Sequence, residues 1–249
     1  GGTNTSWAMP IEYFKEVLVP HLSKFCEKID VKLLKRGYYP KGGGEVEIKI
    51  KPKYKLKDYS SFEEFWKKIQ SNEENAHINL TEQGYLIGIK GVSHASKELQ
   101  NANVAERQAH ASQQILNKHT NAITLYKEYP ETLSIGTGIT LWAIYSKQKD
   151  DIDANNPIII GADALGEKGK PAEKVGEEAA HELVKQMQTK TPADKHLADN
   201  LIPWMALFKP SMVRTSEITK HTLTNIYVVE QFLGKMFEVD EEEKRIRTE

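Results

Sequence analysis

The sequence predicts an α+β fold in which a larger domain is interrupted by a smaller inserted α/β domain. Towards both ends of the chain, apolar residues recur at helical spacing, over 11–25 and over 223–233. Between these helices, EVEIKIK at 45–51 alternates strictly between apolar and charged residues, which is typical of a half-buried strand. A β-α-β-β-β pattern that starts near 81 is bounded by polar stretches, as expected of an insertion.

The composition indicates a soluble globular protein of one large or two ordinary domains. The 249 residues are 39% hydrophobic and 28% charged, with a formal net charge of -1. This balance gives no global attraction for nucleic acid, so an RNA site would have to be a local patch. The single cysteine, Cys26, excludes a disulfide framework and a cysteine-based zinc cluster and fits a reducing cytoplasm.

We expect a cytoplasmic protein that does not enter a membrane, because no apolar run approaches membrane length and no signal peptide is visible. The chain begins at Gly1 without an initiator methionine, and we interpret it as an interior segment of a longer protein.

The first 80 residues are predicted to pack a helix against a hairpin. Pro10 suits the first position of the helix, where its missing N–H is not needed, and Pro20 should kink or split it. The apolar residues at helical spacing are Ile11, Phe14, Leu18, Leu22 and Phe25. The hairpin has strands at 30–36 and 45–51, joined by the turn GYYPKGGG, and a short helix follows at 62–69. The covered face of the second strand is predicted to carry Val46, Ile48 and Ile50.

A basic stretch overlaps this hairpin. It carries nine cations and only two anions, Glu45 and Glu47, which gives a local charge of +7. The cations are Lys32, Lys35, Arg36, Lys41, Lys49, Lys51, Lys53, Lys55 and Lys57, and the interleaved aromatics are Tyr38, Tyr39 and Tyr54. Such a stretch can bind single-stranded RNA through phosphate neutralisation and base stacking. It can equally be a solvated strand face whose edge lysines prevent aggregation, and both interpretations stay open.

The predicted insert contains strands at 85–92, 122–129, 138–146 and 157–160, a helix at 101–118 and a polar linker at 147–156. His94, His110 and His119 fall within it without metal-ligand spacing, and we interpret them as surface histidines. GADALGEKG at 161–169 follows a strand and precedes a helix at 171–188, as a phosphate-binding loop would. However, Glu167 and Lys168 replace the required lysine and hydroxyl residue, so we interpret the stretch as a glycine-rich loop that returns to the larger domain.

The sequence DKHLADNLIPWMAL at 194–207 is the first of two chemically interesting segments. Ala193 or Asp194 can begin a helix that Pro203 must end or bend. His196, Asp199 and Asn200 share one face, which we expect to be exposed. That face can accept hydrogen bonds from ribose hydroxyls or the adenine amine and can donate hydrogen bonds to phosphate. A solvated polar face is nevertheless the default interpretation.

The second segment, 211–233, becomes a helix with Ser216 or Thr219 as N-cap. Its buried stripe is predicted to contain Leu223, Ile226, Val229 or Glu230, and Leu233. His221 falls in the first turn, where the helix end disfavours imidazolium and attracts phosphate. A neutral imidazole beside a bound phosphate can accept a phosphoryl or nucleotidyl group. The alternative is a histidine packed at a helix start.

Five motifs resemble those of the RNA 3'-terminal phosphate cyclases and occur in the same order. They are GGTNTSWAMP, RGYYPKGGGEVEI, ALGEKGKPAEKVGEEAA, KHLADNLIPWMAL and RTSEITKHTLTNIYVVEQFLG, and they span almost the whole chain. The resemblance implies a large domain of repeated β-α-α-β units, incomplete here, with the smaller α/β domain inserted. We therefore expect the large domain at 1–80 and 168–249 and the insert at 81–167.

The resemblance implies a ligase that converts an RNA 3'-terminal phosphate to a 2',3'-cyclic phosphodiester with ATP and Mg²⁺ or Mn²⁺. His221 would be the nucleophile that becomes adenylylated. The segment that holds ATP would be His196, Leu197, Ala198, Asp199 and Asn200, and the residues beside the adenine would be Met9, Pro10 and Tyr13. The sequence itself shows no metal motif. An alternative is a non-catalytic relative that binds RNA or assists ribosome assembly, although such relatives lack the nucleophilic histidine.

Two departures from the family pattern affect these expectations. Some members have tyrosine and glutamine where this chain has His196 and Asn200, which changes the details of stacking and hydrogen bonding. Members also carry a preceding portion with a glycine-rich loop and several arginines that serve the phosphates. We expect the chain to be catalytically weak without it.

Overall fold

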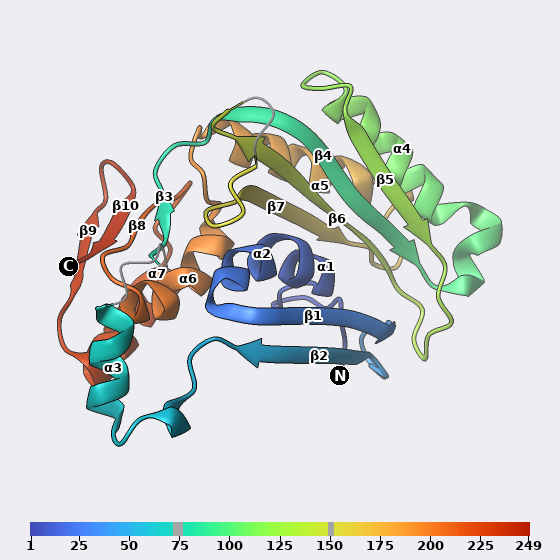
Figure 1. Cartoon of the computed structure of the whole chain (residues 1–249). Helices are drawn as coiled ribbons and strands as arrows, with labels where there is room; N and C mark the ends of the chain where they lie inside the picture. Colours follow the sequence, from blue (N-terminus) through green and yellow to red (C-terminus); the bar gives the residue numbers. More distant parts are fainter. Residues whose placement is uncertain (72–76, 149–151) are drawn as a thin grey trace.

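A four-stranded mixed sheet with strand order β5-β4-β6-β7 lies at the centre of the molecule (Figure 1). The computed structural model describes residues 1–71, 77–148 and 152–249. Strand β4 pairs in parallel with β5, β6 pairs antiparallel with both β4 and β7, and almost every residue of β6 is buried. The strands are β4 (Tyr85–Ala95), β5 (Ile123–Glu128), β6 (Thr137–Ser146) and β7 (Ile158–Leu165).

Helices cover both faces of this sheet. Helices α4 (Val104–Leu116) and α5 (Ala172–Gln188) pack on one face, and the N-terminal helical segment packs on the other (Figure 1). Gly161 of β7 makes the second contact possible, because a Cβ at this position would lie 2.6 Å from the ring of Tyr13. Strands β6 and β7 are therefore covered on both faces, whereas β5 at the edge has no fully buried residue.

The N-terminal helical segment is split as Pro20 predicts. It runs through α1 (Ile11–Tyr13), a π-helical stretch (Phe14–Leu18) and α2 (Val19–Leu22). Pro20 has no N–H for an intrahelical bond, which accounts for a break in the regular ladder around it. The prediction of a split helix is confirmed.

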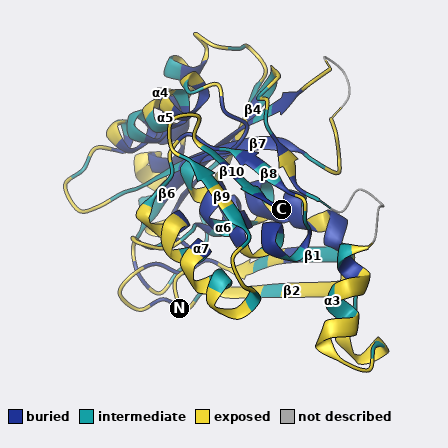
Figure 2. Ribbon diagram, turned by 90° about the vertical axis from the view of Figure 1, so that its left-hand side faces the viewer, coloured by how far each residue is buried: buried dark blue, intermediate teal, exposed yellow. Residues whose placement is uncertain are grey.

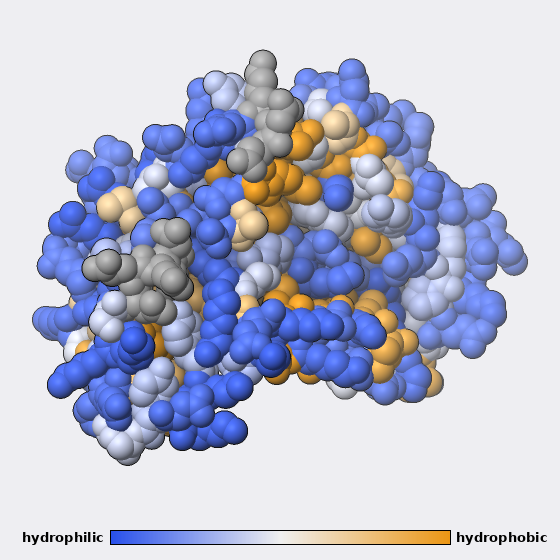
Figure 3. All heavy atoms as spheres, in the orientation of Figure 1, coloured by the Kyte–Doolittle hydropathy of each residue, from blue (hydrophilic) through white to orange (hydrophobic). Residues whose placement is uncertain are grey.

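The hairpin consists of β1 (Cys26–Lys35) and β2 (Glu45–Pro52), joined by a turn in which Gly42 and Gly43 take positive φ. The predicted covered face of β2 is wrong: Val46, Ile48 and Ile50 are 36%, 47% and 57% exposed. The reason is that these three side chains pack against neither hydrophobic cluster of the described residues, so their face of the hairpin stays open. Figure 3 shows hydrophobic residues at the surface along this hairpin.

A second four-stranded sheet, with order β3-β8-β10-β9, forms the C-terminal part. Its strands are β3 (Asn79–Leu80), β8 (Met212–Arg214), β9 (Phe237–Asp240) and β10 (Arg245–Thr248). Around it lie α3 (Phe62–Gln70), α6 (Lys195–Leu207) and α7 (Lys220–Leu233). Helix α6 is largely buried, whereas the outer side of α7 is exposed (Figure 2). Pro203 does not end α6, which continues for four residues beyond it to Leu207.

One hydrophobic cluster joins all these layers. It extends from Tyr13 of α1 through the central sheet to α6 and on to Ile246 of β10. Helix α5 begins after residue 167, yet it packs on the sheet of the predicted insert. The division at 81 and 167 stays a prediction. The predicted linker 147–156 and the polar stretch 58–80 include residues outside the described ranges. In the described part of the chain, no helix has the length and apolarity needed to span a membrane.

Candidate active site

Four segments line a cavity of about 810 Å³: the N-terminal loop with α1, strand β7, helix α6 and the first turn of α7. The predicted site residues that it brings together are Met9, Pro10, Tyr13, His196, Asn200 and His221. They come from positions more than two hundred residues apart in sequence. The rings of Tyr13 and His196 meet edge to face, with centroids 6.4 Å apart. The cavity wall thus contains apolar surface, imidazoles and an amide, a mixture typical of small-molecule sites.

The carboxylate of Asp194 ties three cavity walls together. It caps α6 by accepting from the backbone N–H groups of His196 and Leu197, at 2.9 and 3.0 Å. It also accepts from the hydroxyl of Tyr13 at 2.6 Å and from the backbone N–H of Gly161 at 2.9 Å. Burial raises the pKa of Asp194, while these donors oppose the rise. Burial and the adjacent Asp194 charge raise the pKa of Tyr13 well above its ordinary value, so Tyr13 stays a donor.

Asp199 joins α6 to the start of α7. Its carboxylate accepts from the hydroxyls of Thr219, at 2.7 Å, and Thr222, and its backbone oxygen accepts from the side chain of Asn225 at 2.8 Å. Thr219 is the N-cap of α7 and forms a capping box with Thr222. The prediction that Asp199 lies on an exposed face is wrong, because it is 8% exposed and its carboxylate points at these hydroxyls. It lies outside the cavity lining and acts on the helix that carries His221.

His221 occupies the first turn of α7 and is exposed towards the cavity. The alternative of a histidine packed at a helix start is therefore wrong. At this position the unpaired N–H groups of the first turn favour a bound anion. The predicted stripe is wrong at its first position: Ile226 is buried and Val229 packs against the core as predicted, whereas Leu223 is 41% exposed and Thr222 is buried in its place. The bond from Thr222 to Asp199 draws that side chain inward and turns Leu223 outward.

Besides Asp199, two other predicted site residues do not reach the cavity. Leu197 and Ala198 are 0% and 1% exposed and belong to the hydrophobic core. The backbone N–H of Leu197 bonds to Asp194. Their part in the site is to seat α6, so that His196 and Asn200 face the cavity from the other side of the helix.

Asp163 is a cavity residue that the sequence interpretation missed. Strand β7 continues to Leu165, so residues 161–165 are not the predicted glycine-rich loop. Because side chains alternate along a strand, Asp163 points to the same face as Gly161, the face against Tyr13. Burial raises the pKa of Asp163 to about 6, which His196 opposes. A strand prediction that ran through the alternating GADAL segment would have found this residue.

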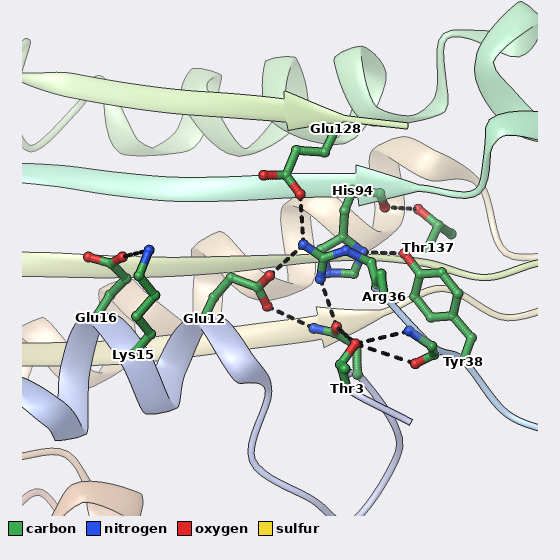
Figure 4. Close-up of polar contacts among 11 residues, drawn as sticks. Thr3, Glu12, Lys15, Glu16, Arg36, Tyr38, His94, Glu128 and Thr137 are labelled. Atoms are coloured by element: carbon green, nitrogen blue, oxygen red, sulfur yellow. Dashed lines mark hydrogen bonds and ion pairs between the residues drawn. The ribbon is translucent and has the colours of Figure 1, made fainter. Parts of the chain in front are cut away.

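A buried polar network supports the N-terminal loop (Figure 4). Arg36, 3% exposed, donates to Asn4 at 2.7 Å and forms ion pairs with Glu12 at 2.5 Å and Glu128 at 2.8 Å. Asn4 in turn donates to Glu12 at 2.8 Å. Burial alone would raise the pKa of Glu12, but the charge and hydrogen bonds of Arg36 lower it. The network links the loop, α1, β1 and β5 and so holds one wall of the cavity in place.

His94 belongs to the same network, and its prediction as a surface residue is wrong. It is 0% exposed, and its Nδ1 lies 2.7 Å from the hydroxyl of Tyr38. Burial and the charge of Arg36 lower the pKa of His94 to about 3, so the ring is neutral. His94 lies in β4, and α1 and the hairpin turn that carries Tyr38 cover it. The spacing of residues around His94 in the sequence does not reveal this cover.

Five of the nine cations of the basic stretch pair with carboxylates: Lys32, Lys35, Arg36, Lys49 and Lys51. Lys35 pairs with Glu45 at 2.8 Å, and Lys49 pairs with Glu47 at 3.1 Å, both at the surface. Arg36 and Tyr38 are withdrawn into the buried network, while Tyr39 is 81% exposed. These contacts favour the solvated-strand interpretation of the stretch. Among the described residues, no group of His, Cys, Asp or Glu side chains is arranged to hold a metal ion.

Comparison with known proteins shows the family. The model of the family described as RNA 3'-terminal phosphate cyclase matches residues 1–239. The chain is 41% identical over 239 residues to the protein of that name from Pyrococcus furiosus, covering 96% of the chain and 60% of the relative. It is 37% identical over 251 residues to that from Pyrobaculum aerophilum, covering 100% of the chain and 64% of the relative. The chain thus spans somewhat less than two thirds of the length of these relatives, and it belongs to the RNA 3'-terminal phosphate cyclase family.

Proposed function

We propose that the protein converts an RNA 3'-terminal phosphate to a 2',3'-cyclic phosphodiester with ATP, and that His221 is the residue that becomes adenylylated. The observation that carries this proposal is the position of His221, exposed at a helix N-terminus and at the wall of the cavity. The names of the relatives support the reaction class. The single cysteine fits a cytoplasmic enzyme.

The chemistry would proceed in three transfers. First, a ring nitrogen of His221 attacks the α-phosphorus of ATP; the N–P bond forms, and pyrophosphate leaves with the electrons of the broken P–O bond. Second, an oxygen of the RNA 3'-phosphate attacks the same phosphorus, which breaks the N–P bond and frees the imidazole. Third, the RNA 2'-hydroxyl attacks its own activated phosphate, loses its proton to solvent and expels AMP. The covalent intermediate divides one difficult displacement into easier steps.

The cavity residues would contribute binding and orientation. The first-turn N–H groups of α7 favour the phosphate beside His221. His196 and Asn200 offer an imidazole and an amide to the nucleoside, and Met9 and Pro10 offer an apolar surface to the base. Mg²⁺ or Mn²⁺ would arrive with the triphosphate and neutralise its charge, since no described residues fit a resident ion.

The decisive experiment is covalent labelling. The protein is incubated with α-³²P-ATP and Mg²⁺, and the chain is then tested for label that acid removes but alkali does not, as expected of a phosphoramidate. His221→Asn should abolish the label. The matched control is His119→Asn, which changes an exposed histidine outside the cavity and should label like the unchanged protein.

Label that survives His221→Asn would refute the assigned nucleophile. RNA binding that depends on salt, with no label even when the chain is joined to the preceding portion that members of the family carry, would favour the non-catalytic alternative. Conversion of a 3'-phosphorylated oligonucleotide to its cyclic form by the labelled protein would establish the remaining two transfers.

A further inference from the structure

We infer that Asp163 determines nucleotide specificity in the cavity by accepting a hydrogen bond from the exocyclic amino group of adenine. This inference rests on the proposed function. It assigns a role to a residue of β7 that is not part of the motif segments expected to hold ATP.

The first argument is geometric. Asp163 lines the cavity, on the face of β7 that lies against Tyr13. Within the described ranges its carboxyl group accepts no hydrogen bond, and the hydroxyl of Tyr13 and the N–H of Gly161 on the same face both donate to Asp194. A half-buried carboxyl that points into a cavity without a partner loses solvation without compensation, and a ligand donor would restore it.

The second argument concerns the direction of the nucleotide. Asp163 lies on the face of β7 that packs against Tyr13, and the carboxylate of Asp194 lies at the same place, where it accepts from the hydroxyl of Tyr13 and the N–H of Gly161. Two carboxyl groups at this wall of the cavity repel phosphate, whereas the N-terminus of α7, which carries His221, attracts it. The phosphates would therefore lie towards His221, and the nucleoside would lie towards Asp163.

The third argument concerns donors. An ionised carboxylate only accepts hydrogen bonds. In the adenine base, the exocyclic amine is the sole donor, whereas a 6-oxo purine presents an acceptor at the same position. With ATP, Asp163 would accept a hydrogen bond from the amine. With ITP, it would face the 6-oxo oxygen, another acceptor, and a site with an unpaired buried polar group discriminates strongly against such a ligand.

The test compares binding of ATP, ITP and 2'-deoxy-ATP, each as its Mg²⁺ complex, by equilibrium dialysis at pH 8. The unchanged protein should bind ATP about 10- to 100-fold more tightly than ITP, as expected for one hydrogen bond to a charged group. Asp163→Asn keeps the size but offers both donor and acceptor, so the ratio should fall close to one. The control Asp58→Asn removes an exposed carboxylate outside the cavity and should leave the ratio unchanged.

A pH series gives a second readout that a merely structural role would not change. Below about pH 6 the carboxyl of Asp163 takes up a proton and can donate to a 6-oxo group, so preference for ATP should decline in acid. His196 from α6, Glu12 from α1, Asp194 and Glu182 from α5 also face this region. For this reason the comparison uses the ATP-to-ITP ratio, whose pH dependence should vanish in Asp163→Asn.

The outcomes separate the inference from the function on which it rests. Equal binding of ATP and ITP, or an unchanged ratio in Asp163→Asn, would overturn the role of Asp163 while leaving nucleotide binding intact. A loss of affinity for 2'-deoxy-ATP that disappears in Asp163→Asn, while the ATP-to-ITP ratio stays unchanged, would assign Asp163 to the ribose and overturn its role at the base. No binding of any nucleotide would remove the proposed function itself. Retained ITP binding by Asp163→Asn serves as the check that this variant folds.

Discussion

Asp194 and Asp199 lie five residues apart at the start of α6, and each organises one end of the site. Asp194 fixes α6 against Tyr13 and β7, and Asp199 fixes the first turn of α7 against α6. Neither side chain lines the cavity, although Asp199 was predicted to do so. Both carboxylates instead hold the cavity-lining residues in place. A buried carboxylate that accepts several hydrogen bonds fixes the position of each element that supplies a donor.

His94 makes an acid-sensitive contribution to stability. Its folded-state pKa of about 3 lies below the ordinary value of 6.5, so the unfolded chain binds the proton more readily between these values. The stability that the neutral ring contributes is complete above about pH 6.5 and is lost as pH falls towards 3. Between pH 7 and pH 5 this linkage amounts to about 2 kcal/mol.

We therefore compare the free energy of unfolding in urea at pH 7 and at pH 5. On going from pH 7 to pH 5, His94→Gln, which lacks the titrating ring, should lose less of this free energy than the unchanged protein. Comparing the two proteins cancels the contributions of other groups, including Asp163, whose raised pKa acts in the opposite direction. The exposed His119→Gln serves as the control and should follow the unchanged protein. Parallel losses in all three proteins would show that His94 titrates normally in the folded state.

At the scale of elements, the sequence predicted most helices and strands and misplaced several of their faces. The periodicity of apolar residues identified α3, α5 and β6 closely, because each repeats its pattern over its whole length. In α7, Ile226 and Val229 lie on the buried side as predicted, but Thr222 replaces Leu223 because its hydroxyl bonds to Asp199, which is distant in sequence. The open face of β2 likewise depends on whether another element packs against it, which no local pattern contains.

The same reasoning explains how much of the site was accessible from sequence. The motif segments place His221, His196 and Asn200 on helices, and their assembly at one cavity is observed. Asp163 was missed because the two glycines around it suggested a loop, whereas Gly161 serves close packing against Tyr13 within a strand. Burial of His94 depends on Tyr38 and Arg36, which approach from another element.

Thr219 offers a test of the helix start that carries His221. Thr219→Ala removes the N-cap of α7 and one donor to Asp199, and should cost about 1 kcal/mol of the free energy of unfolding. Because the loosened turn positions His221 less accurately, the rate of adenylylation should fall by more than ATP affinity does. The matched control is Thr224→Ala on the exposed side of α7, where the hydroxyl bonds only to the backbone oxygen of Lys220. Equal rates in the two variants would show that the cap does not position the histidine.

On the scale of the whole molecule, the core crosses the predicted domain boundaries. The main hydrophobic cluster includes residues of α1, the central sheet, α6 and the C-terminal sheet without interruption. The Tyr13 hydroxyl spans 181 residues to reach Asp194. Because the predicted insert shares this core with the larger domain, both are stabilised by the same core contacts. We therefore expect the insert and the larger domain to unfold together.

Two tryptophans allow this expectation to be tested. Trp142 lies in β6 within the predicted insert, and Trp204 lies in α6 outside it, and both belong to the main cluster or pack against it. The variants Trp142→Phe and Trp204→Phe are made in a chain that also carries Trp7→Phe and Trp66→Phe, so that one tryptophan remains in each. In urea titrations, that tryptophan should report the same slope with respect to denaturant in both variants, and each fluorescence midpoint should agree with circular dichroism on the same variant. A fluorescence transition that precedes or follows the circular dichroism transition in the Trp204→Phe variant would mean that 81–167 unfolds separately. The insert would then be an independent domain, and the sheet contacts of α1 would be an interface between domains and not part of a shared core.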